Sequence, residues 1–158
     1  MSVERTTLDT NVLFYAADED AGALQERARE VIDRAARHHE CFLTLQTLSE
    51  FFASITRKGK LSVADASGVV ADYQDLFPVV AATPDSLRMA IGAVQRHSLS
   101  FWDAMQWAVA RQQGATLFLS EDLQDGRELE GVLFRDPFKA DDPFAPTAAG
   151  PRSRSRGS

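Results

Sequence analysis

A regular alternation of short apolar runs with longer amphipathic segments limits the fold of this chain more than any other feature. The clearest run is 115–119 (ATLFL), which is uninterrupted and therefore typical of a strand covered on both faces. Further short strands are predicted at 5–8, 41–43, 78–81 and 132–134. Strands that alternate with helices pair in parallel through right-handed crossovers. The sequence thus predicts an α/β fold, a three-layer α/β/α sandwich with a short, mainly parallel central sheet.

Helices are predicted wherever apolar residues recur every three or four positions. The clearest one spans 23–38, where Leu24, Ala28, Val31, Ile32 and Ala35 follow this spacing. The others are expected at 12–17, 45–58, 62–76, 84–97 and 100–113. The pattern ends after residue 136, so we expect one domain over 1–138. The remaining residues, 139–158, are rich in Pro, Ala, Ser and Arg, and we expect a disordered tail there.

Composition narrows the possible functions. A length of 158 residues suits one domain. The formal net charge of −6 argues against nucleic-acid binding by bulk electrostatics, and it suits a chain that collects carboxylates for a cation. The longest apolar stretches span only about ten residues, against the roughly 20 that a membrane helix needs. The N-terminus has no signal-peptide core, so we expect a cytoplasmic protein without a membrane partner. One cysteine and three histidines cannot form a cysteine/histidine zinc cage.

Four acidic residues stand at the edges of predicted elements. Asp9 follows the first predicted strand, and Asp122 comes shortly after the strand 115–119. Ligands bind outside the carboxyl ends of parallel strands, so both acids are expected at the functional edge of the sheet. Glu50 and Asp103 stand early in two helices, each between bulky apolar residues. If the four carboxylates converge, they repel one another unless a cation joins them, and Mg²⁺ or Mn²⁺ is the expected cofactor.

Such an ion would explain how an acidic protein acts on a polyanion. A bound divalent ion lowers the pKa of a coordinated water and can clamp a phosphodiester. Each acid also has a purely structural interpretation. Asp9 can cap a helix, Ser100 and Asp103 match a capping box, Glu50 can be a solvated helix charge, and Asp122 can be a turn residue. Only the set of four points to a site.

The motifs occur in a familiar order. The segments LDTNVL at 8–13, FWDA at 101–104 and LSEDL at 119–123, with Glu50 between the first two, resemble the PIN-domain ribonucleases. Among these the chain is most similar to VapC-type toxins of type II toxin–antitoxin systems. The resemblance spans roughly residues 5–138 and includes the closing RDPF at 135–138.

This resemblance implies a PIN-like fold and a metal-dependent endoribonuclease. The implied reaction is in-line hydrolysis of an RNA phosphodiester bond, for example in tRNA, which leaves a 5′-phosphate and a 3′-hydroxyl. Asp9, Asp103 and Asp122 are expected to hold Mg²⁺ or Mn²⁺, and Glu50 is expected to orient or activate the attacking water. A cognate antitoxin and a homodimer are implied as partners.

Further residues match the family's polar positions. Thr10 and Asn11 belong to the first motif, and Ser120 matches the hydroxyl residue before the last acid. The register of that acid is open among Glu121, Asp122 and Asp125. The family spacing of hydroxyl, any residue and acid favours Asp122, with Asp125 as an outer-sphere helper.

Substrate contacts are sparse in the sequence. Arg57, Lys58 and Lys60 lie about two helical turns beyond Glu50 and could contact RNA, or they could favour the end of their helix electrostatically. Trp102 and Trp107 are predicted to be core residues rather than base-stacking ones.

Two other functions remain as alternatives. One is a catalytically silent PIN-like module that binds RNA or protein. The other is a phosphatase with Asp9 as the nucleophile, which would require an acid where Asn11 stands.

Overall fold

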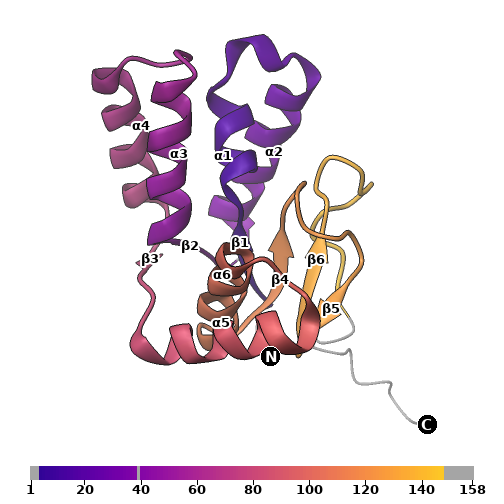
Figure 1. The fold of residues 1–158 in the computed structure, drawn as a ribbon. Coiled ribbons are helices and arrows are strands. Elements are labelled where there is room, and N and C mark those ends of the chain that lie inside the picture. Colours follow the sequence, from indigo (N-terminus) through magenta and orange to yellow (C-terminus); the bar gives the residue numbers. More distant parts are fainter. Residues whose placement is uncertain (1–3, 39, 148–158) are drawn as a thin grey trace, which may run out of the picture.

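A six-stranded sheet forms the middle layer of the computed structural model, which describes residues 4–38 and 40–147 (Figure 1). The strand order is β3-β2-β1-β4-β6-β5. Five strands run parallel, and β5 pairs antiparallel with β6. The strands are β1 (Arg5–Leu8), β2 (Glu40–Thr44), β3 (Val79–Val80), β4 (Ala115–Leu119), β5 (Glu128–Leu129) and β6 (Val132–Arg135).

Helices cover both faces of this sheet. They are α1 (Thr10–Ala17), the 3-10 turn η1 (Glu19–Ala21), α2 (Ala23–His38), α3 (Leu45–Arg57), α4 (Val63–Leu76), α5 (Pro84–His97) and α6 (Phe101–Gln112). Alternation along β4 builds two cores. Leu117 and Leu119 pack with residues of α1 to α4, whereas Phe118 packs with residues of α5 and α6. The predicted three-layer sandwich is therefore confirmed.

The short β5 strand and the η1 turn are the elements that the sequence analysis did not predict. Both are too short to show a hydrophobic period. In the β5–β6 hairpin, Glu130 and Gly131 both have positive φ, 47° and 89°. A glycine adopts this backbone conformation readily, so Gly131 supports the tight turn.

Residues 139–147, which follow the predicted domain boundary at residue 138, pack against the domain. Phe144 is only 7% exposed and belongs to the core on the α2 side. The Arg135 guanidinium donates hydrogen bonds to the carbonyls of Pro143 and Ala145, at 2.9 and 2.8 Å. One buried aromatic ring and a few backbone acceptors hold a segment whose composition suggested disorder. The rest of the predicted tail, 148–158, lies outside the described residues.

Within the described ranges, we find no helix with the length and hydropathy that a membrane span requires.

Candidate active site

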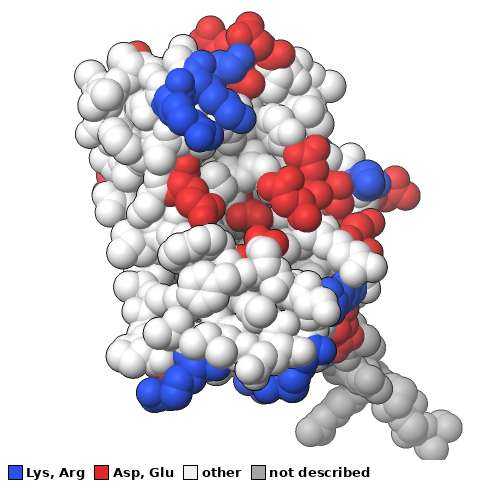
Figure 2. Space-filling view, in the orientation of Figure 1, with Lys and Arg blue, Asp and Glu red and all other residues white. Residues whose placement is uncertain are grey.

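A pocket of about 400 Å³ opens at the carboxyl ends of β1 and β4. These two parallel strands are neighbours, with Leu8 in register with Leu119. The chain continues from β1 toward β2 on one side and from β4 toward β6 on the other, so the pocket lies where the strand order reverses. Open α/β sheets bind ligands at this kind of position. In the space-filling view, Asp and Glu side chains surround a central hollow, with a group of Lys and Arg above it (Figure 2).

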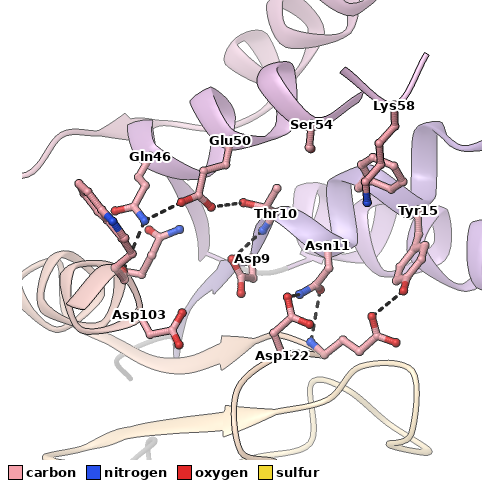
Figure 3. Close-up of a pocket in the computed structure, with 14 residues that line it drawn as sticks. Asp9, Thr10, Asn11, Tyr15, Gln46, Glu50, Ser54, Lys58, Asp103 and Asp122 are labelled. Atoms are coloured by element: carbon pink, nitrogen blue, oxygen red, sulfur yellow. Dashed lines mark hydrogen bonds between the residues drawn. The ribbon is translucent and has the colours of Figure 1, made fainter. Parts of the chain in front are cut away.

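All four predicted acids line this pocket (Figure 3). Asp9 follows β1, Asp122 follows β4, Glu50 comes from α3, and Asp103 comes from the first turn of α6. Residues 113 positions apart in the sequence thus meet at one sheet edge.

Asp9 is the most buried of the four carboxylates, with 9% of the residue exposed. It is the N-cap of α1, and one oxygen accepts the Thr10 backbone N–H at 2.8 Å. The other oxygen accepts the Ser120 hydroxyl at 2.7 Å. Burial raises the pKa of Asp9 to about 6 even though both hydrogen bonds oppose the shift, and the charges of Asp122 and Glu50 raise it further. The capping role and the pocket role therefore coexist in this residue.

The loop after β4 is held by Ser120, which is fully buried. Its hydroxyl accepts the backbone N–H groups of Asp122 and Leu123 at 3.1 and 3.3 Å while it donates to Asp9. Asn11 closes the loop from α1, because its amide donates to Asp122 at 3.2 Å and accepts the Glu121 backbone N–H at 3.3 Å. Polar side chains thus hold the segment 9–11 and the loop 120–123 together.

Glu50 is oriented by two donors. Its carboxylate accepts the Thr10 hydroxyl at 2.9 Å and the Gln46 side-chain amide at 2.8 Å (Figure 3). It is therefore not simply a solvated helix charge. Gln46 was not predicted, although it lies one helical turn before Glu50, a spacing that places both on one helix face.

Asp103 is held only through its backbone. Ser100 is the N-cap of α6, and its hydroxyl accepts the Asp103 backbone N–H at 3.3 Å. Within the described residues, the Asp103 carboxylate has no hydrogen bond or ion pair, so the reciprocal half of the predicted capping box is not formed. Its oxygens are available toward the pocket (Figure 3).

The remaining predicted residues divide between the pocket and other places. Lys58 lines the pocket, with its Nζ 4.9 Å from the centre of the Phe14 ring. Lys60 instead pairs with Asp18 and Asp20, at 3.2 and 3.0 Å, and these partners raise its pKa.

Besides Lys60 and Ser120, two more predicted residues, Arg57 and Asp125, do not line the pocket. Arg57 is exposed at the end of α3. Asp125 accepts the backbone N–H of Asp136 at 2.9 Å, a contact that holds the turn before β5 against the end of β6.

One pocket contact outside the predicted set joins α1 to the β4 loop. Tyr15 donates a hydrogen bond to Glu121 at 2.6 Å, and this bond raises the pKa of Tyr15 to about 12. The spacing gives a signal for it, since Tyr15 lies one helical turn after Asn11, which contacts the same loop. Glu121 is therefore used in this contact, whereas Asp122 carries the carboxylate that Asn11 holds.

The prediction that both tryptophans are core residues is correct for Trp107 and wrong for Trp102. Trp107 is 1% exposed and donates its indole N–H to the Leu129 carbonyl at 3.1 Å. Trp102 is 63% exposed and lines the pocket beside Asp103.

The donor set fits a hard divalent cation by its chemistry. The pocket offers carboxylate oxygens, the ligands that Mg²⁺ and Mn²⁺ prefer. Five acidic residues and one lysine line the pocket, and burial of Asp9 leaves its charge poorly solvated. In the part of the chain that the structure describes, no three His, Cys, Asp or Glu side chains stand close enough to form a preformed metal cage.

The family is decided by the sequence match. Residues 6–124 match the sequence model of the PIN domain. The chain belongs to the PIN domain family. No curated protein sequence matches this PIN domain.

Solved structures agree in fold. VapC20 of Mycobacterium tuberculosis, a toxin that cleaves the sarcin-ricin loop, is 20% identical with a TM-score of 0.59, covering 72% of this chain and 86% of that one. A toxin–antitoxin complex from Klebsiella pneumoniae is 16% identical with a TM-score of 0.62, covering 85% and 99%. DNA-bound VapBC from Salmonella typhimurium is 16% identical with a TM-score of 0.63, covering 85% and 98%. At these identities the likeness shows that the PIN domain fold is shared.

Proposed function

We propose that this PIN domain is a metal-dependent endoribonuclease and the toxin of a toxin–antitoxin pair. The observation that carries the proposal is the pocket itself. Carboxylates from β1, α3, α6 and the β4 loop line one hollow at the switch point of the sheet. Carboxylates that the fold brings together repel one another, which costs stability. Clusters of this kind are concentrated at functional sites.

Asp9, Asp103 and Asp122 would hold Mg²⁺ or Mn²⁺. When bound, the ion supplies a coordinated water of lowered pKa and positive charge next to the phosphate. The chain's own groups prepare this position. Ser120 and the Thr10 backbone N–H fix both oxygens of Asp9, and Asn11 fixes Asp122. Second contacts of this kind orient ligands and tune their basicity.

In this proposal Glu50 accepts the proton of the attacking water. Each of its oxygens already accepts one hydrogen bond, from Thr10 and from Gln46, and a carboxylate oxygen can accept another. Attack at phosphorus breaks the bond to the 3′-oxygen, which takes a proton from solvent. The products are a 5′-phosphate and a 3′-hydroxyl. Lys58, the one cation that lines the pocket in the described residues, would contact a neighbouring phosphate.

The proposed partners rest on the related structures and on exposed apolar surface. Two of the related structures are toxin–antitoxin complexes, which supports a cognate antitoxin here. On α5, Leu87, Ile91 and Val94 are 43%, 47% and 37% exposed along one side of the helix. This apolar side supports a homodimer. A structured RNA such as tRNA is the proposed substrate, and the cytoplasm is the proposed location.

The test is cleavage of end-labelled RNA by the purified protein with Mg²⁺ or Mn²⁺ and with EDTA. We expect cleavage that EDTA abolishes and that Asp9→Asn and Glu50→Gln each reduce by at least about a hundredfold, the usual effect of removing one group that acts on the transition state. Asp75→Asn is the matched control, because it removes an exposed carboxylate outside the pocket. Cleavage that survives EDTA or Asp9→Asn contradicts the proposal. RNA binding without cleavage would instead identify a silent binding module.

A further inference from the structure

We propose that Trp102 is a stacking platform for an unpaired nucleobase next to the phosphate that is cleaved. This inference rests on the proposed function and names what the substrate must present there. The wall of the pocket next to Asp103 carries a large aromatic ring that the fold itself does not bury, with 63% of the residue exposed.

The surroundings of Trp102 hold it in place and leave its ring available. Its backbone is in the first turn of α6, and its carbonyl accepts the Gln46 amide at 3.4 Å, the same side chain that orients Glu50. The neighbouring Phe101 ring packs edge-on at 4.9 Å between centroids, with the planes at 68°. Among the described residues, the indole N–H has no hydrogen-bond partner. An exposed ring whose indole N–H is unpaired among the described residues thus borders the acidic pocket.

Because the pocket is negatively charged, a contact with RNA that does not depend on charge is favoured next to it. A polyanion meets Asp9, Glu50, Asp103 and Asp122 in the pocket, and only Lys58 among the described lining residues attracts it. Stacking adds affinity without charge, since every base has a π-face, and it contributes about 1–3 kcal/mol per base in single-strand binding proteins. A ring that flanks a phosphate site can therefore supply binding that the charges of this pocket do not.

Stacking on a side chain requires a base that is free of its pair. Specific RNA recognition accordingly targets loops, bulges and ends, where bases can be splayed onto aromatic side chains. We infer that the cleaved linkage lies in an unpaired stretch of RNA and that one of its two flanking bases covers Trp102. The chain would not cut within a continuous duplex.

The test compares two 12-nucleotide probes in the presence of Ca²⁺, an oligoadenylate and a strand of the same length in which all bases are missing. A fluorescent label on each probe reports binding by anisotropy for every protein. In wild type, quenching of tryptophan fluorescence by the oligoadenylate also reports on Trp102, because the other tryptophan, Trp107, is buried. Trp102→Ala should bind the oligoadenylate at least about fivefold more weakly, the lower end of the stacking effect. Trp102→Phe should recover part of this loss, and the abasic strand should bind all three proteins equally.

Controls separate stacking from other roles. Val63→Ala removes an apolar side chain of similar exposure, 65%, outside the pocket and should leave oligoadenylate binding unchanged.

Equal binding of the oligoadenylate by wild type and Trp102→Ala overturns the inference. So does a Trp102→Ala protein that loses self-association in sedimentation but keeps oligoadenylate binding, since Trp102 is then a protein contact. If wild type cleaves RNA but Trp102→Ala binds the oligoadenylate normally, the stacking inference is wrong and the proposed nuclease function is unaffected. If Asp9→Asn cleaves like wild type, the nuclease assignment fails and the binding result stands by itself.

Discussion

Asp9→Asn should stabilise the metal-free protein at neutral pH. Burial raises the pKa of Asp9 from 3.8 to about 6 in the folded state. A folded state that holds its proton more tightly loses stability as the pH rises from about 4 to about 6, because the unfolded chain releases the proton first. A shift of this size corresponds to about 3 kcal/mol at pH 7.5. The neutral amide does not carry this penalty.

The Asp9→Asn variant also loses one of the two hydrogen-bond acceptors of the carboxylate. Asp9 accepts hydrogen bonds at both oxygens, from Thr10 and Ser120, and an asparagine has one acceptor oxygen. One lost hydrogen bond costs about 1 kcal/mol, so the net gain is about 2 kcal/mol.

The assay is urea unfolding of both proteins in EDTA at several pH values. The stability difference should be largest above pH 7 and should shrink through pH 6 toward pH 4, and below that pH the wild-type carboxylate becomes protonated in both states. A variant that is less stable than wild type at pH 7.5, or a difference that does not change with pH, would refute the claim that Asp9 is a destabilised, buried charge.

Other predictions concern the stability of the fold rather than metal binding. Gln106→Met leaves two buried threonine hydroxyls without their partner and should lower the free energy of unfolding by about 2–3 kcal/mol in urea melts. Phe144→Ala should cost about 3 kcal/mol, because the ring is in the core, and an unchanged melt would mean that residues 139–147 are not part of the domain. Tyr15→Phe removes the bond to Glu121 and should cost about 1 kcal/mol, a loss that Glu121→Gln should partly share.

Much of this fold follows from local sequence signals. The continuous run of β4 and the helical spacing of α2 each specify an element without reference to the rest of the chain. The acids could be predicted to converge because parallel strands end at one edge of a sheet and Asp9 and Asp122 each follow one. Short elements such as β5 carry too few residues for a period to be visible.

What could not be predicted depends on side chains that meet only in three dimensions. Trp102 and Trp107 have the same helical context in sequence, and only the packing of α6 against β5 and β6 decides which one is buried. Tyr15 and Glu121 are far apart in the chain, and their contact depends on how α1 lies over the β4 loop. The segment 139–147 is held largely by backbone carbonyls, which leave no trace in the amino-acid composition.

The central claim is that separate carboxylates hold one divalent cation, and Mn²⁺ titration by calorimetry tests it most directly. Wild type should bind Mn²⁺, and Asp9→Asn, Asp103→Asn and Asp122→Asn should each weaken binding by more than about tenfold, since losing even an outer partner has that effect. Asp75→Asn should bind like wild type. Mn²⁺ binding that is unchanged in all three pocket variants would contradict the account.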